Sequence, residues 1–320
     1  MLVAARIVAA ALIFGSCASE PERSTVTSPA RSPVTAESVP TATATATTLV
    51  VATTTTTIAS TSRVATGLTA AELAGELTAV ERAAAAGDGS VGVRQQLLYR
   101  YLAAHADLDG AVLAGVGDDV RPAIERIVSD RQLGQARQAA NPNPSPPSTT
   151  LPTWTVVDAL PADELLADYD DAETATGIAW YWLAAIHLQE TRMGRIIGTS
   201  SAGAVGPMQF LPTTWERCCT GDPTVPRDAI IGAATYLARS GGPADMQAAL
   251  HEYNPNDSYV ATVTAFAENL RDSPQLYLAY REWQVFYATS AGTIRLPVGY
   301  TAAEPIDAAT YLAEHPGDAG

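Results

Sequence analysis

The fold of this chain is decided by one stretch, Ile178-Ala-Trp-Tyr-Trp-Leu-Ala-Ala-Ile-His-Leu-Gln-Glu-Thr191. As a helix it is apolar almost all round, which predicts a helix inside a protein core rather than on its surface. Leu183, Ile186 and Glu190 recur at helical spacing, so we expect the Glu190 carboxylate on an apolar stripe. Gly194 follows closely and is expected to end the helix near Glu190.

Glu190 is the first candidate for chemistry. Burial disfavours the charged form of a carboxyl group, and the negative end of the helix dipole acts in the same direction. We therefore expect the pKa of Glu190 to be raised toward neutral pH, where a carboxyl group can serve as a general acid. Alternatively, Glu190 reaches solvent at a frayed helix end or pairs with Arg192 or Arg195. The sequence alone leaves both interpretations open.

Glycine and proline are concentrated just after this helix, in Gly198-Thr-Ser-Ser-Ala-Gly-Ala-Val-Gly-Pro-Met-Gln-Phe-Leu-Pro-Thr-Thr-Trp215. The segment is too rich in glycine for a plain helix and too apolar for a disordered loop. Such a composition is typical of backbone that passes close to a bound ligand. A phosphate-binding loop is excluded, because no Gly-Lys-Ser/Thr ending is present.

The composition favours a mainly α protein. Hydrophobic residues make up 47% of the 320 residues but aromatic residues only 7%, and alanine supplies much of the apolar share, which favours packed helices over a β-sandwich. A formal charge of −15 argues against nucleic acid as a partner and against an anionic lipid surface binding the folded part. The three cysteines, at 17, 218 and 219, are too few for a disulfide framework or a four-cysteine zinc site.

Capping residues and apolar periodicity predict the remaining helices. A capping box formed by Thr69 and Glu72 starts a helix that ends before Gly87. Further helices are expected at residues 91–105, 121–138, 162–173, 228–238, 245–252, 259–270 and 275–287, with Trp283 and Phe286 buried. The proline cluster at 141–148 marks the best boundary. We therefore divide the chain into an N-terminal helical region (67–140), a proline-rich linker (141–153), a second helical domain (154–300) and a C-terminal tail (301–320).

The first residues have the pattern of an export signal. Arg6 supplies a positive charge, and the apolar run at 7–15 is too short to span a bilayer. The Gly15-Ser16-Cys17 sequence is similar to a bacterial lipobox, which implies a signal peptide at 1–17 and lipidation of Cys17, although Phe14 stands where leucine is usual. Ordinary secretion and an uncleaved anchor are the alternatives. Residues 18–66 are roughly half threonine and serine with interspersed proline, which predicts a disordered stalk.

Three motifs after residue 155 resemble those of the bacterial lytic transglycosylases, specifically the membrane-bound type B group of the lysozyme-like superfamily. Glu190-Thr-Arg-Met-Gly194 is similar to the catalytic Glu-Ser-x-x-Gly motif, with Thr191 in place of serine. Gly206-Pro-Met-Gln209 is similar to Gly-x-Met-Gln. Tyr253-Asn254, with Tyr259-Val260 shortly after, is similar to the third motif. The resemblance covers roughly residues 155–300, and the preceding helical region looks like that of actinobacterial lipoprotein members.

The resemblance implies a lysozyme-like catalytic domain that cleaves the β-1,4 bond between N-acetylmuramic acid and N-acetylglucosamine of peptidoglycan glycan strands. Glu190 would protonate the glycosidic oxygen and then take a proton from the muramic C6 hydroxyl, which closes a 1,6-anhydro ring. By the same resemblance, Gly206, Met208 and Gln209 would form the sugar cleft. Ser200 and Asn254 would bind substrate polar groups, and Tyr253 and Tyr259 would shape the subsite at the cleaved bond.

Each assignment has an alternative. Met208 or Tyr259 could serve only as core, and Ser200 only as a turn former. A water-using muramidase with Glu216, Asp222 or Asp257 as partner acid, or a non-catalytic peptidoglycan-binding protein, could carry the same motifs. We expect packing roles for His187 and His251, no cofactor and no metal, and a location in the cell envelope through the Cys17 lipid anchor. The pairing of Cys218 with Cys219 is left open, as are protein partners.

Overall fold

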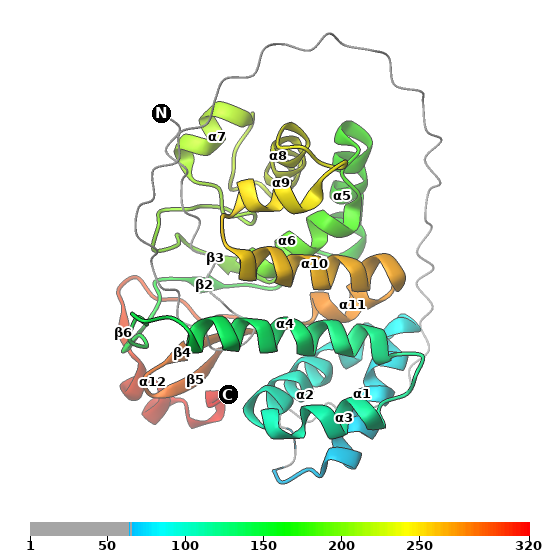
Figure 1. Cartoon of the computed structure of the whole chain (residues 1–320). Helices are drawn as coiled ribbons and strands as arrows, with labels where there is room; N and C mark the ends of the chain where they lie inside the picture. The colour runs from blue at the N-terminus through cyan, green and yellow to red at the C-terminus, as the bar shows by residue number, and fades with distance from the viewer. Residues whose placement is uncertain (1–63, 65) are drawn as a thin grey trace.

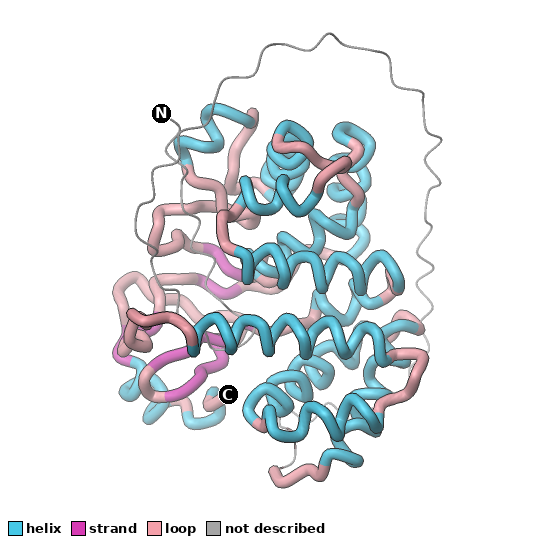
Figure 2. The backbone as a smooth tube through the Cα atoms, in the orientation of Figure 1, coloured by secondary structure: helices cyan, strands magenta, loops and turns pink. Residues whose placement is uncertain are grey.

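The computed structural model describes residue 64 and residues 66–320 (Figure 1). The predicted signal peptide, Cys17 and nearly all of the predicted stalk lie outside the described residues. Within them, helices form most of the structure and the short strands gather on one side of the molecule (Figure 2). The mainly α fold class is therefore confirmed. None of the described helices is long and apolar enough to cross a membrane.

The N-terminal region contains the three predicted helices and one, α3 (Asp109–Gly115), that was not expected. The predicted helices are α1 (Ala70–Ala85), α2 (Gly92–Ala104) and α4 (Arg121–Ala139), with short 3-10 turns at Gly89–Val91 and Ala106–Leu108. The predicted capping box is confirmed, because the Thr69 hydroxyl accepts a hydrogen bond from the Glu72 amide and the Glu72 side chain accepts one from the Thr69 amide.

Residues 154–300 contribute seven helices. They are α5 (Ala162–Thr176), α6 (Trp180–Thr191), α7 (Pro212–Cys218), α8 (Pro226–Arg239), α9 (Met246–Tyr253), α10 (Asp257–Asp272) and α11 (Leu276–Arg281). The predicted helix at 178–191 is α6, which packs against α10, while α5 packs against α8. Helix α7 was not expected. Pro212 occupies its first turn, where a missing amide hydrogen costs nothing.

The predicted helix at 275–287 is wrong at its C-terminal end. Helix α11 stops at Arg281, and Val285–Thr289 forms strand β4, which pairs antiparallel with β5 (Gly292–Leu296). Valine and aromatic residues favour the pleated conformation, and Gly292 turns the chain with a φ of +110°. The predicted burial of Trp283 and Phe286 is confirmed.

Two further strand pairs join distant parts of the described chain. Strand β1 (Thr150–Leu151) pairs with β6 (Ile306–Asp307), and β2 (Thr155–Val156) pairs with β3 (Ile196–Ile197). Residues 301–320, expected as a tail, contain β6, helix α12 (Ala308–Glu314) and a 3-10 turn at Pro316–Asp318. They pack with the β4–β5 hairpin around a small core that includes Ile294 and Tyr311.

The main core runs through both helical regions. It contains Leu77 and Ile127 from the N-terminal helices together with Ile186, Phe266 and Trp283 from the second half. Helix α4 lies alongside α10 (Figure 1). Helix α10 in turn packs against α6. The N-terminal region therefore reaches the helix that carries Glu190 through α10.

Candidate active site

Helix α6 ends just after Glu190. Three consecutive residues, Arg192, Met193 and Gly194, adopt left-handed backbone angles and stop the helix. Glu190 is only 6% exposed. The Arg192 guanidinium donates instead to the Leu188 carbonyl oxygen at 2.8 Å. The alternative in which Glu190 exits to solvent is therefore wrong.

The predicted pairing of Glu190 with Arg195 is also absent from the described structure. Arg195 donates to the Arg281 carbonyl oxygen at 3.0 Å and lies 3.5 Å from the Asp158 carboxylate. Neither oxygen of Glu190 has a hydrogen-bond partner in the described structure. Burial raises the pKa of Glu190 to about 8, as the sequence predicted. At neutral pH the carboxyl group keeps its proton, so it can donate that proton to a bound ligand.

Two tyrosines lie beside this carboxyl group. Glu190 raises the pKa of both Tyr253 and Tyr259 through its charge, after burial as the main cause. The Tyr259 hydroxyl in turn lowers the Glu190 pKa against the effect of burial, although the two groups do not meet with the geometry of a full hydrogen bond. The tyrosine rings stack with centroids 6.4 Å apart and planes 9° apart.

The third motif is placed by a helix break. Helix α9 ends at Tyr253, and Pro255 prevents its continuation. The Asn256 side chain then caps α10 by accepting hydrogen bonds from the amides of Ser258 and Tyr259. This break brings Tyr253 from one helix and Tyr259 from the next to the same side of Glu190. Asn254, which follows Tyr253, is 3% exposed.

The glycine-rich loop approaches the end of α6 through its backbone. The Thr191 hydroxyl donates to the Pro207 carbonyl oxygen at 2.6 Å and accepts a hydrogen bond from the Gly194 amide at 3.1 Å. The Tyr253 hydroxyl donates to the Met208 carbonyl oxygen at 2.6 Å. These bonds fix the loop to both helices of the site. The sequence identified Thr191 only as a motif position. Its hydroxyl group, directly after Glu190, was the feature that could have indicated a hydrogen bond to the loop.

The loop itself turns tightly at Gly206. A Cβ atom there would lie 1.8 Å from the Pro223 carbonyl oxygen, and φ is +77°, so only glycine fits. The sequence ascribed this glycine to a bound ligand, but the close neighbour is protein backbone. Gln209 has a φ of 50° and donates from its side chain to the Gly206 carbonyl oxygen at 2.9 Å.

Met208 and Ser200 have different structural roles in this loop. The Met208 side chain is fully buried in the main core, so its link to the site is its carbonyl oxygen. The Ser200 hydroxyl accepts a hydrogen bond from the Ala204 amide at 3.0 Å, and the Ser200 amide donates to the Ala204 carbonyl oxygen. Ser200 therefore forms a turn while remaining half-buried.

The two histidines near the motifs differ in burial. His187 is fully buried with its Nδ1 atom 2.8 Å from the Tyr169 hydroxyl, and burial lowers its pKa to about 3. It lines a cavity of about 450 Å³ behind the loop, with Gly194 and Pro207. Glu190 is not among the residues that line this cavity. The His251 side chain is 53% exposed and lies 3.9 Å from Asp257.

The described residues hold no group of three or more side chains suited to bind a metal ion. The site itself contains one buried carboxyl group, two buried tyrosines and a loop fixed through its backbone. Such an arrangement can transfer a proton to a bound ligand and receive one back.

The comparisons with known proteins find one relative that matches part of the chain. A stretch of 127 residues is 29% identical to a membrane-bound lytic murein transglycosylase F of Thiobacillus denitrificans. The match covers 37% of this chain and 27% of that relative, so the chain spans about a quarter of the relative's length. No family model and no solved structure matches the chain. Over this stretch, the chain is similar to a lytic murein transglycosylase.

Proposed function

We propose that this chain is a peptidoglycan lytic transglycosylase. The observation that carries the proposal is the state of Glu190, which is buried, protonated at neutral pH and without a hydrogen-bond partner in the described structure. A buried polar group without a partner costs stability, and its retention is explained when a substrate supplies the partner. The partial similarity to a lytic murein transglycosylase supports the same assignment.

In the proposed reaction, Glu190 donates its proton to the glycosidic oxygen between N-acetylmuramic acid and N-acetylglucosamine, and the bond from C1 to that oxygen breaks. The carboxylate then takes the proton of the muramic C6 hydroxyl, and the C6 oxygen forms a bond to C1. The proton count balances without water, and the muramic residue leaves as a 1,6-anhydro sugar. A carboxyl group with a pKa near 8 suits both directions of transfer.

The neighbouring residues take supporting roles in this proposal. Gln209 and Asn254 bind substrate polar groups, as does Ser200, and Gly206 keeps the loop in place. Tyr253 and Tyr259 exclude water from Glu190 and orient it, while Met208 holds the loop through its carbonyl oxygen. Peptidoglycan strands are the proposed substrate, and a lipid on Cys17 would keep the protein in the cell envelope.

A hydrolase of the usual type needs a second carboxylate facing the first across the scissile bond. Burial and the Tyr259 hydroxyl set the pKa of Glu190, and none of the three acids considered as partners contributes to it. Asp222 accepts hydrogen bonds from the Thr224 amide and hydroxyl, which lower its pKa. The Asp257 side chain is 72% exposed, and Glu216 is also exposed. The anhydro-forming reaction is therefore favoured over water-dependent cleavage.

Digestion of purified sacculi tests the proposal directly. Mass spectrometry of the released muropeptides should find 1,6-anhydromuramic ends. Reducing muramic ends in their place would identify a muramidase. If the folded protein bound sacculi but released nothing, it would instead be a peptidoglycan-binding protein.

A further inference from the structure

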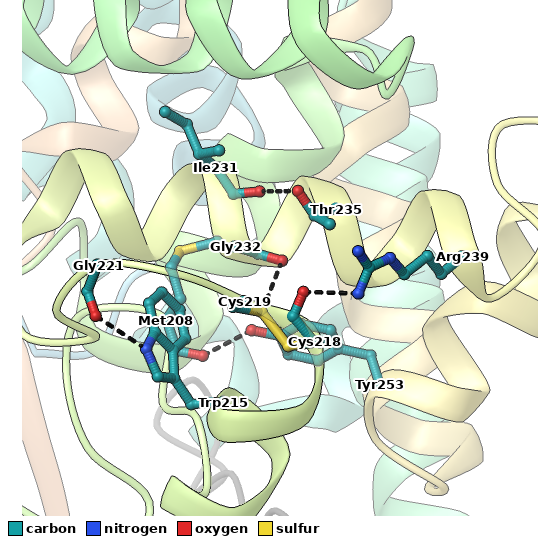
Figure 3. The surroundings of a disulfide bond; sticks show 10 residues. All are labelled: Met208, Trp215, Cys218, Cys219, Gly221, Ile231, Gly232, Thr235, Arg239 and Tyr253. Carbon is teal, nitrogen blue, oxygen red and sulfur yellow. Dashed lines mark hydrogen bonds between the residues drawn. A yellow bond between two sulfur atoms is a disulfide. The ribbon is translucent and has the colours of Figure 1, made fainter.

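The structure resolves the question of the adjacent cysteines. Cys218 and Cys219 are joined by a disulfide at the C-terminal end of α7 (Figure 3). Cys218 is the last residue of the helix, and Cys219 continues in an extended conformation. Both residues are half-buried. The small ring formed by neighbouring cysteines restricts the backbone at the point where α7 ends and the chain turns toward α8.

The disulfide packs directly on α8. The Cys219 Sγ atom lies 3.6 Å from the Gly232 carbonyl oxygen, and Arg239 donates to the Cys218 carbonyl oxygen at 2.7 Å (Figure 3). A Cβ atom on Gly232 would lie 2.4 Å from the Trp215 ring and 3.4 Å from the Cys219 sulfur. The absence of a side chain on Gly232 lets both groups rest on α8, so the disulfide helps set the distance between the two helices.

From α7 a continuous set of aromatic contacts reaches the proposed site. The Trp215 ring packs edge-on against Phe210 with centroids 5.1 Å apart, and Phe210 packs edge-on against Tyr253 at 5.6 Å. All three side chains are buried. Phe210 directly follows Gln209, and the Tyr253 hydroxyl bonds the Met208 carbonyl oxygen. A movement of α7 would therefore reach Gln209, which directly precedes Phe210, whereas Glu190 lies on α6, which packs against α10.

We propose that the Cys218–Cys219 disulfide positions the glycine-rich loop for substrate binding, and that its reduction weakens binding. This inference rests on the proposed function. The reductant is a dithiol. One of its thiolates attacks a cysteine sulfur, and the sulfur–sulfur bond breaks to give a mixed disulfide. The second thiol of the reductant closes its own disulfide, and both reductant protons end on the protein thiols. The Cys219 thiol can then donate a hydrogen bond to the Gly232 carbonyl oxygen, and the end of α7 is released from the ring.

The experiment measures turnover of soluble glycan strands by the oxidised full chain, before and after dithiothreitol. Alkylation with iodoacetamide and peptide mass spectrometry report the state of Cys218 and Cys219 separately from Cys17. We expect reduction to raise KM about tenfold while the alkaline limb of the pH profile stays in place, and reoxidation to restore KM. A merely structural role predicts a different pattern, in which the folded fraction and kcat fall while KM is unchanged.

A C218S/C219S double variant is the matched control. It should show the raised KM and no further response to dithiothreitol, and circular dichroism should establish that it is folded. An unchanged KM in protein shown to be fully reduced would overturn the inference. If the oxidised protein produced no anhydro ends, the proposed function would fail on its own. Hydrogen exchange then still decides the positioning role, because peptides covering residues 205–218 should exchange faster on reduction, and equal exchange would refute it.

Discussion

Two buried glutamates, one in each helical region, differ in the hydrogen bonds that their carboxyl groups accept. Glu81 on α1 is 1% exposed and Glu190 on α6 is 6% exposed, and burial raises the pKa of both. One Glu81 oxygen accepts hydrogen bonds from Gln95 at 2.9 Å and from the Tyr99 hydroxyl at 2.5 Å. Glu190 accepts none in the described structure. The comparison separates a carboxyl group that joins helices through one bonded oxygen from a carboxyl group with neither oxygen bonded.

Replacing each of the two carboxyl groups by an amide should give the largest difference in turnover. Glu190→Gln should lower the release of anhydromuropeptides by about 10²- to 10⁴-fold, because an amide has no acidic proton to transfer. Glu81→Gln keeps an oxygen acceptor for Gln95 and Tyr99, so its turnover should stay within about twofold of the parent. Circular dichroism and sacculus binding establish that both variants fold. Equal losses in the two variants would show that Glu190 acts only through the core.

The pH dependence of stability is the next largest effect. The pKa of Glu190 is raised from 4.5 to about 8, so between these pH values the folded protein holds a proton that the unfolded chain has released. The free energy of unfolding therefore falls as pH rises through this window, and the change is complete above about pH 8. Glu190→Gln lacks this titration. Urea unfolding from pH 5 to 8.5 should find the variant gaining stability relative to the parent as pH rises, and parallel curves would contradict the assignment.

The sequence was sufficient to predict why Glu190 is buried. The apolar run around it, Gly194 after it and Pro255 in the third motif are local signals, and the structure bears out the helices that they delimit. The β4–β5 hairpin was missed because Val285 and Phe286 continue the apolar pattern of α11, and pairing with Leu296 and Arg295 is a tertiary contact. The common core across the proline-rich linker could not be predicted either, since it depends on packing between α4 and α10.

The candidate site could be predicted only in part, because some of its contacts also depend on tertiary packing. Motif spacing identified Glu190, Tyr253 and Tyr259, whose mutual electrostatic effects place them together. The hydrogen bond from Thr191 to Pro207 required the folded loop. The roles of the remaining motif residues in substrate binding stay predictions, because they concern a ligand.

Removing one hydroxyl near each glutamate should have smaller effects on stability, and the two effects should differ in size. Tyr99→Phe deprives buried Glu81 of a donor and should cost about 1–3 kcal/mol of unfolding free energy. The Tyr259 hydroxyl has no hydrogen-bond partner in the described structure, so Tyr259→Phe should change stability by less than about 1 kcal/mol. Chemical denaturation compares the two. A larger cost for Tyr259→Phe would mean that its hydroxyl bonds Glu190 in solution.

The smallest effects on turnover are expected at the exposed acids. Asp222→Asn, Glu216→Gln and Asp257→Asn each remove a carboxylate that solvent or local hydrogen bonds already stabilise, so turnover should stay within about twofold of the parent. A partner acid in a hydrolase would instead be needed to activate water, and its loss would abolish turnover. Each variant is assayed by mass spectrometry of the product ends. If one of them lost activity while the parent released reducing ends, a second carboxylate would have to act with Glu190, and the single-acid reaction would be refuted.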